Sequence, residues 1–538
     1  MSRRVVLTPL IAVLAALMVT ACTGGGSSGD PSAGGGPVVF ALSTDVDVLD
    51  PQQFRNDTSY IITASLSGTL ISEAYEDQEG GVLKATGKYR SSIAEYPPKT
   101  TTTGEGSRVT FKINQGAKFA DGSLITAHDW VYTWRRIFEG PGYLAALLPL
   151  IGIESPSSVR AVNDETLVID RSFDSPMFDP FMASPCCFGV MSKKAGEAHA
   201  TKSDPWAGEW FASNPVSSGP LKIASWSKGE ELVLESNAGH PDADLVEAPR
   251  FVLKVVPSQE DRIALVSQGA IDVALDLPAR EVSRLEDNPG VKVHDFDGRR
   301  VHYLGFGLDA DGPVSDPKVR EAIMNAVPYS TLLEEVLFGY GQEVHSVVSK
   351  GMPGYEDVFA VEQDLTEAKR LLSESSYDGT PLSLAVRQAQ PLDQAAAVFI
   401  QDTLREVGLT VEINTIPDAS FQEQVGQRKL PFFVMDWQSL GNDGFYQLSW
   451  VAQSQSPINY TGFSDSRVDK IIKAGVPESD PDKRAALVAE AAELFSDATP
   501  WVPLFQPSNV VVTSAGIRGV NDFYDPLRRI EFLKKESP

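Results

Sequence analysis

The sequence is poor in cysteine, in histidine and in positive charge. Its 538 residues contain three cysteines and six histidines, and 46 lysines and arginines stand against 72 aspartates and glutamates. A strongly negative chain is repelled by phosphate backbones and by anionic lipid headgroups, which argues against nucleic acid as a partner. Three cysteines supply no disulfide framework, so the fold has to depend on hydrophobic cores.

Two of the cysteines, Cys186 and Cys187, are neighbours in the chain. Their Cα atoms lie about 3.8 Å apart across a trans peptide, below the usual range for a disulfide, so a bridge between them would be strained. We expect two thiols, or one strained bridge, packed in a loop, and a redox or metal role is the less favoured alternative.

Familiar catalytic and cofactor motifs are also absent. The sequence has no Gly-x-Ser-x-Gly elbow, His-Glu-x-x-His, P-loop or Gly-x-Gly-x-x-Gly, and its histidines form no close ligand pair. Residues 225–228 fit Ser-x-x-Lys, but they lie between expected strands and lack the Ser-Asp-Asn and Lys-Thr-Gly partners of penicillin-binding enzymes. We therefore expect a protein that is not an enzyme and that holds neither a cofactor nor a metal.

One apolar run stands out, at the start of the chain. Arg3 and Arg4 precede an apolar stretch over 5–18, which leads through Val-Thr-Ala to Cys22. This order is typical of a secretory signal with a lipobox, and the run is shorter than the roughly 20 residues of a membrane span. It resembles the sites of bacterial lipoproteins, so we expect a signal peptide over 1–21 and a lipid anchor at Cys22.

The remainder of the chain begins with a glycine- and serine-rich stretch over 22–37, which predicts a flexible tether. Removal of the signal leaves 44 basic against 72 acidic residues, so the mature chain carries a net charge near −28. About 500 residues follow the tether, which is too many for one hydrophobic core, so we expect two or three lobes.

Local signals in the first half of the chain predict individual elements. Apolar residues alternate over 109–113, as in a half-buried strand. Thr126 and Asp129 form a capping-box pattern at the start of a helix. One face of that helix carries three aromatic residues, expected in the core: Trp130, Trp134 and Phe138. Asp316 and Pro317 predict the start of another helix.

Regular alternation of helices and strands over residues 364–437 predicts a βαβ-type lobe. The expected helices cover 365–374, 392–407 and 418–428, and the expected strands cover 382–386, 409–413 and 431–435. Ligands of such sheets collect beyond the carboxyl ends of the strands. Arg387 follows one expected strand directly, and Asp436 and Trp437 follow another.

The segment 110–129, Thr-Phe-Lys-Ile-Asn-Gln-Gly-Ala-Lys-Phe-Ala-Asp-Gly-Ser-Leu-Ile-Thr-Ala-His-Asp, closely resembles the signature of family 5 extracellular solute-binding proteins. Further blocks agree with that family in order: 214–221, 269–273, 316–322, 365–372 and 463–469. These proteins are the peptide-binding lipoproteins of ABC importers. The resemblance covers almost the whole mature chain. It implies an α/β fold of the two-lobed periplasmic-binding-protein type (type II, cluster C) with an extra third domain.

The resemblance also implies a division of the chain and a function. Lobe I would comprise 38–72, 206–300 and 500–538, the extra domain II 73–205, and lobe III 301–499. The protein would be an anchored, monomeric receptor outside the cytoplasm that captures a di- or oligopeptide between its lobes and delivers it to membrane permease subunits. The alternatives are a non-peptide solute, such as an oligosaccharide, a metal chelate or haem, and a regulatory or scaffold lipoprotein of the same fold.

Arg387 has a ligand-binding role by this resemblance. Its spacing to Pro391 and to residues 399–401 matches the dipeptide-type members, in which the arginine grips the ligand's C-terminal carboxylate. A guanidinium presents two parallel donors to a carboxylate, so the chemistry fits the position. We expect Trp437 to stack on the ligand.

Leu440 departs from the family pattern. Peptide binders of the family usually carry an aspartate three residues after the tryptophan, where it pairs with the peptide's α-ammonium, and here that position is Leu440. Leucine cannot offset the cost of burying an unpaired ammonium. We expect Asp436, or Asp443, which is also acidic in dipeptide-type relatives, to take this role; otherwise the ligand has no free amino terminus.

Overall fold

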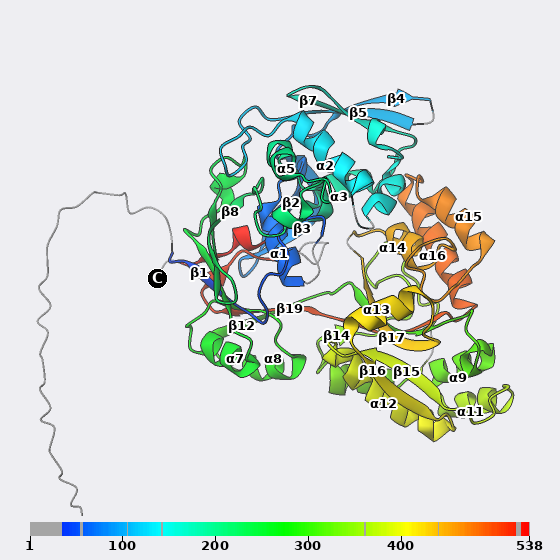
Figure 1. Cartoon of the computed structure of the whole chain (residues 1–538). Coiled ribbons are helices and arrows are strands. Elements are labelled where there is room, and N and C mark those ends of the chain that lie inside the picture. The colour runs from blue at the N-terminus through cyan, green and yellow to red at the C-terminus, as the bar shows by residue number, and fades with distance from the viewer. Residues whose placement is uncertain are drawn as a thin grey trace, which may run out of the picture. The chain divides into compact units, whose positions relative to one another are not determined.

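Mixed α/β structure runs through the part of the chain that the computed structural model describes, which is residues 35–53, 57–104, 106–140, 142, 144–359, 362–439, 441–522 and 529–536. Cys22 and the expected signal peptide, the side chains of Cys186 and Cys187, and Leu440 lie outside the described residues. The α/β class is confirmed. Three sheets hold most of the described strands, and helices pack on them (Figure 1).

The first sheet has seven strands in the order β12-β19-β11-β1-β10-β9-β8. Their bounds are β1 Val38–Leu42, β8 Leu221–Ser227, β9 Glu231–Ser236, β10 Phe251–Val255, β11 Val273–Ala274, β12 Val291–Phe296 and β19 Asn509–Ser514. Strand β1 runs parallel to both β10 and β11. Its alternate residues enter two cores, one shared with α1 (Asp57–Leu66) and one shared with α7 (Gln259–Ser267) and α8 (Ala279–Leu285).

A four-stranded sheet, β4-β5-β7-β6, forms a second layer together with helix α2 (Ala127–Glu139). Its strands are β4 Lys99–Thr103, β5 Gly106–Lys112, β6 Val159–Asn163 and β7 Thr166–Arg171. The capping box of α2 is confirmed, because the Asp129 carboxylate accepts the Thr126 backbone N–H at 2.9 Å. Trp130 and Trp134 are buried and Phe138 packs against the same core, as the aromatic face predicts.

Shorter elements join these layers. Strands β2 (Ile71–Gln78), β3 (Val82–Ser91) and β21 (Val520–Asp522) form a three-stranded sheet, and β20 (Ile517–Arg518) pairs with β22 (Lys534–Lys535). The short helices are α3 Phe178–Ala183, α4 Pro185–Phe188, α5 Lys193–His199, α6 Gly208–Phe211 and α10 Tyr329–Thr331. The backbone of Cys186 and Cys187 lies in α4, so the expected loop is wrong at these residues; Pro185 at the first helical position favours the helix.

The third sheet has six strands in the order β14-β18-β13-β17-β15-β16. Its strands are β13 Arg300–Phe306, β14 Gly341–Gln342, β15 Leu382–Arg387, β16 Val411–Ile416, β17 Phe432–Gln438 and β18 Trp501–Pro507. The associated helices are α9 Pro317–Ala326, α11 Leu365–Ser373, α12 Pro391–Val407, α13 Asp418–Gly426, α14 Gly444–Val451, α15 Ser466–Gly475 and α16 Pro481–Ser496. Strand β15 runs parallel to β16 and β17, which confirms the predicted βαβ pattern.

Helices cover both faces of this sheet (Figure 1). Leu382, Leu384 and Val386 of β15 pack in one core with α12, whereas Ala385 packs in another with α13. Strand β17 alternates in the same way. Two covered faces explain why these strands read as almost continuous apolar runs.

The observed strands cross two of the expected domain boundaries. The boundary at residue 500 assigns β18 to lobe I, but β18 pairs with β13 and β14 in the six-stranded sheet, and the chain returns to the seven-stranded sheet only with β19. The boundary between residues 72 and 73 falls inside β2. The first difference arises because pairing with a distant strand leaves no local signal in the sequence, whereas β2 pairs with its neighbour β3. The other boundaries stay predictions.

Among the described residues, no helix is both long enough and apolar enough to cross a bilayer.

Candidate functional site

Five charged or titratable side chains meet at one edge of the six-stranded sheet. Strands β15 and β17 are parallel, so their carboxyl ends share that edge, and the antiparallel strand β13 begins there. Helix α12 also starts at this edge, just after β15. The resulting group, which we call the charged cluster, consists of Arg300, His302, Arg387, Asp393 and Asp436.

Arg387 is at the strand end that the sequence predicts, but it already has partners. Its side chain is 8% exposed, and Nη2 donates to Asp393 Oδ2 at 2.8 Å and to Asp436 Oδ1. Burial acts to lower the pKa of Arg387, yet the two carboxylates more than offset it and hold the pKa above its ordinary value. The Nε–H group is buried without a partner among the described residues. Arg387 is therefore a fixed cation whose buried Nε–H donor is unused among the described residues.

Asp436 is shared by two arginines. Arg300 Nη1 donates to Asp436 Oδ2 at 2.9 Å, while Arg387 occupies Oδ1. Burial acts to raise the pKa of Asp436, but the two guanidinium groups outweigh it and hold the pKa well below its usual range. Asp436 is consequently ionised, and each of its oxygens accepts a hydrogen bond from a resident arginine.

Arg300 connects the charged cluster to the first sheet's helices. Its Nη2 donates to Gln438 Oε1 at 2.7 Å and to Asp57 Oδ2 at 3.2 Å. Asp57 is the first residue of α1, which packs in the core of the seven-stranded sheet. The pair therefore bridges the elements expected to form lobes I and III.

The interior end of the charged cluster is His302. Its Nδ1 lies 2.7 Å from Oδ1 of Asp393, which is fully buried. Its ring stacks on that of Phe505, with 5.0 Å between the ring centroids. Hydrogen bonds thus run in one chain through His302, Asp393, Arg387, Asp436, Arg300 and Asp57. Such a network fixes the geometry of every member.

Trp437 lies next to Asp436 in sequence but faces the other side of the sheet, because side chains alternate along β17. It packs against the core on the α13 face, with its ring 6.3 Å from that of Trp450. Its indole N–H is buried and has no partner among the described residues. The structure thus brings Trp437 and Arg387 to one face of neighbouring strands.

Asp443 serves the local structure. It is the N-cap of α14 and accepts the Phe445 N–H at 2.8 Å. Arg484 of α16 binds both of its oxygens, at 2.9 and 2.8 Å. Within the described residues, no hydrogen bond or ion pair joins Asp443 to the charged cluster.

Sequence reasoning missed Arg300, His302 and Asp393. Asp393 carries a signal in retrospect, because it lies in the first turn of the helix that follows the Arg387 strand. Arg300 and His302 carry none, since they reach the site by pairing β13 with β17, and Arg300 and Asp436 are 136 residues apart.

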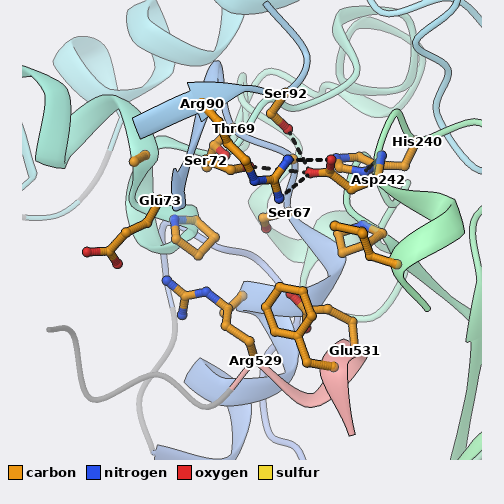
Figure 2. Close-up of a pocket in the computed structure, with 17 residues that line it drawn as sticks. Ser67, Thr69, Ser72, Glu73, Arg90, Ser92, His240, Asp242, Arg529 and Glu531 are labelled. Atoms are coloured by element: carbon orange, nitrogen blue, oxygen red, sulfur yellow. Dashed lines mark hydrogen bonds and ion pairs between the residues drawn. The ribbon is translucent and has the colours of Figure 1, made fainter. Parts of the chain in front are cut away.

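A separate pocket lies between the end of α1, the strands β2 and β3, and residues 529–532 (Figure 2). Arg90 of β3 binds Asp242 through two hydrogen bonds, at 2.6 and 3.2 Å, and Glu531 accepts the Ser65 hydroxyl at 2.7 Å. None of the residues predicted from the sequence lines this pocket. Among the described residues, no group of three or more histidine, cysteine or acidic side chains could hold a metal ion.

Comparison with known proteins gives consistent results. The family model described as bacterial extracellular solute-binding proteins, family 5 Middle, matches residues 88–458. The chain is 24% identical over 489 residues to the probable D,D-dipeptide-binding periplasmic protein DdpA of Escherichia coli, covering 90% of each chain. It is 23% identical over 487 residues to the oligopeptide-binding protein OppA of Bacillus subtilis, covering 85% of this chain and 86% of the relative.

A solved structure shows the same fold. The periplasmic binding protein DppA of Helicobacter pylori, in complex with the peptide STSA, superposes with a TM-score of 0.78 at 21% identity. The match covers 93% of this chain and 98% of the other. The predicted two-lobed periplasmic-binding-protein fold with an extra domain is thereby confirmed.

Proposed function

Because the chain belongs to family 5 of the bacterial extracellular solute-binding proteins, we propose that it is the receptor of an ABC importer for peptides. The family binds solutes for transporters and acts outside the cytoplasm, as predicted from the sequence. In our proposal the protein performs no chemistry of its own. It captures its ligand and hands it to membrane permease subunits.

The names of the relatives support a peptide as the ligand. The two curated relatives are a probable D,D-dipeptide-binding protein and an oligopeptide-binding protein, and the Helicobacter pylori structure holds a peptide. A protein of similar fold from Pseudoalteromonas is in complex with Met-Leu. These ligands share a peptide backbone, so we favour a peptide over an oligosaccharide, a metal chelate or haem.

The main evidence for a ligand site is the unused Nε–H donor of Arg387. Arg387 is held by Asp393 and Asp436 at the carboxyl end of a strand, where ligands of such sheets collect. A ligand carboxylate that accepts from this donor would satisfy a buried polar group that otherwise costs free energy. In our proposal Arg387 binds the ligand carboxylate and Asp436 holds Arg387 in position. Trp437 lies on the same binding face.

Asp443 is better assigned to the local structure than to the ligand. Its oxygens already serve the α14 cap and Arg484. A ligand ammonium would have to displace Arg484, which is 8% exposed and would be left as an unpaired buried charge.

Capture requires the two lobes to close on the ligand, which then stabilises the closed state through contacts with both. In this proposal the pair of Arg300 and Asp57 joins elements that we assign to the two lobes. We further propose that Cys22 is lipidated and that residues 22–37 tether the monomeric receptor to the membrane beside its permease.

Native mass spectrometry of the protein, purified without denaturation, tests the proposal. We expect a co-purified peptide, released from Arg387→Ala because the variant loses about 2–5 kcal/mol of affinity for a carboxylate. Arg405→Ala is the matched control, since Arg405 is exposed on α12 and pairs with Asp402. A co-purified sugar, chelate or haem would contradict the proposal, and so would a peptide retained by Arg387→Ala.

A further inference from the structure

The Nε–H group of Arg387 is unused although two carboxylates contact the same guanidinium. Both hydrogen bonds to them come from Nη2, which donates to Asp393 Oδ2 at 2.8 Å and to Asp436 Oδ1. The Nε–H group is buried and has no partner among the described residues. Arginine and a carboxylate frequently pair through two parallel hydrogen bonds, so pairing through one nitrogen needs a cause.

His302 supplies that cause at Asp393. The second oxygen of Asp393, Oδ1, lies 2.7 Å from His302 Nδ1. A carboxylate paired with a guanidinium accepts hydrogen bonds, so the Nδ1–H group is the donor. This bond turns Oδ1 towards the imidazole ring and leaves only Oδ2 for Arg387.

Asp436 is held in a similar way by Arg300, whose Nη1 donates to Oδ2 at 2.9 Å. The two holding residues differ in burial. The side chain of Arg300 is 31% exposed, so water can reach the oxygen that it would leave. The side chains of His302 and Asp393 are 3% and 0% exposed, so no water replaces the imidazole donor.

Loss of the His302 donor would leave Asp393 Oδ1 buried without a partner, which costs free energy. The guanidinium that Asp393 already contacts offers an unused donor, the Nε–H group of Arg387. A rotation of the carboxylate would satisfy both groups in the side-on arrangement that arginine and carboxylate favour. The ligand would then find its donor occupied.

We propose that His302 is a positioning residue for ligand capture, because its hydrogen bond to Asp393 keeps the Arg387 Nε–H donor available for the ligand's carboxylate. His302 does not touch the ligand and acts only through Asp393 and Arg387. This inference rests on the proposed function, since it concerns the peptide site at Arg387.

A competition between peptide acids and peptide amides tests the inference on the full-length protein. The probe is a synthetic di- to tetrapeptide library, supplied as equal amounts of forms with a C-terminal carboxylate and with a C-terminal carboxamide. Mass spectrometry of the retained peptides gives the acid-to-amide ratio, which does not depend on how much of the protein is folded. The unaltered protein should enrich the acids at least about thirtyfold, and Arg387→Ala should abolish the preference.

Variants at residue 302 assign the positioning role. His302→Leu has no donor, and the amide of His302→Gln reaches the place of Nε2 instead of Nδ1, so each should lower the ratio at least about tenfold. His302→Asn places an amide nitrogen near the position of Nδ1 and should keep the ratio within about threefold of the unaltered protein. His294→Leu is the matched control, because His294 is also buried but lies in the seven-stranded sheet, 3.3 Å from Thr513 Oγ1.

A double variant tests the route through Asp393. Asp393→Ala removes the carboxylate that would take the Nε–H group, so adding His302→Leu to it should change the ratio by less than about twofold. A further tenfold loss would show that His302 acts by another route and would overturn the inference.

The outcomes separate the inference from the proposed function. A ratio that is kept in both His302→Leu and His302→Gln, or that falls equally in His302→Asn or in His294→Leu, overturns the inference and leaves peptide binding in place. A ratio near one in the unaltered protein overturns the role of Arg387 and the inference together. Retention of no peptide in either form overturns the proposed function itself.

Discussion

At the scale of single residues, the site is a set of buried charges that depend on one another. Arg387 could be predicted from the sequence, because it directly follows an apolar strand. Its partners could not all be predicted, since Arg300 and His302 come from a strand whose pairing with β17 depends on the whole fold. From the sequence alone, Asp436 and Asp443 are equally good candidates for a ligand-binding carboxylate. Only the geometry shows that Asp436 joins the charged cluster and that Asp443 caps a helix.

Removal of Arg387 should destabilise the protein as well as weaken ligand binding. Arg387→Ala leaves Asp393 and Asp436 with fewer partners in a buried setting, and breaking a buried pair costs about 3–5 kcal/mol. Urea unfolding of the ligand-free protein measures this. The control Arg405→Ala removes an exposed pair and should cost less than about 1 kcal/mol. Equal losses in the two variants would show that Arg387 is not held as described.

At the scale of elements, the sequence predicts what local pattern determines. The helices and strands over 365–438 follow from their periodicity, and Gly408, at φ +103°, ends α12 in the left-handed conformation that favours glycine. Strand β16 starts at Val411 instead of residue 409, because the Leu409 N–H still bonds back to Leu404 O of α12 and Thr410 lies outside the strand. Strand β18 lies in the six-stranded sheet although it follows the expected boundary at residue 500, since its antiparallel partners are far away in sequence.

Asp443 gives an element-scale prediction, because it joins α14 to α16. Asp443→Ala removes a helix cap and leaves the buried Arg484 without its carboxylate, so we expect a loss of about 3 kcal/mol or more in the free energy of unfolding. Chemical denaturation measures the loss, and ligand affinity should stay unchanged.

Asp465→Ala is its matched control. Asp465 caps α15 in the same way but pairs with the exposed Arg467, so its loss should cost about 1 kcal/mol. If Asp443→Ala loses ligand binding at temperatures where the variant is folded, Asp443 contacts the ligand, and its assignment to the local structure is contradicted.

At the scale of the whole molecule, the six-stranded sheet, helix α12 and the start of α1 bring segments from distant parts of the chain to one site. The family blocks spread over 110–469 indicate the fold, because family resemblance reports the arrangement of the whole chain. The exact crossings between sheets depend on which strands pair, and strand β18 lies across the expected boundary at residue 500 for that reason.

Acid should destabilise the whole molecule before the carboxylates titrate. Burial lowers the pKa of His240 and His294 to about 4, against about 6.5 in an unfolded chain. As the pH falls below about 6.5, the unfolded chain binds protons that the folded chain does not, so each histidine removes about 1–3 kcal/mol between pH 6.5 and 4. Asp436, whose pKa is lowered, adds a further loss below about pH 4.

Thermal melts between pH 7 and 4.5 check this prediction. His294→Gln should flatten the dependence of the melting temperature on pH, because it removes one of the two buried histidines. A flat profile in the unaltered protein would contradict the account of the buried histidines.

The membrane anchor is testable on the same scale. Cells grown with a labelled fatty acid should incorporate the label into the unaltered protein and not into Cys22→Ser. Mass spectrometry of the mature N-terminal peptide should show a lipid on Cys22. Equal labelling of both proteins would place the anchor elsewhere or remove it.

The position of the bound ligand tests the central claim most directly. A crystal structure of the protein purified with its natural ligand should show a peptide whose carboxylate accepts a hydrogen bond from Arg387 Nε at about 3 Å, on the face that carries Trp437. A ligand bound in the pocket between Arg90, Asp242 and Glu531, with Arg387 Nε still unpaired, would contradict the account.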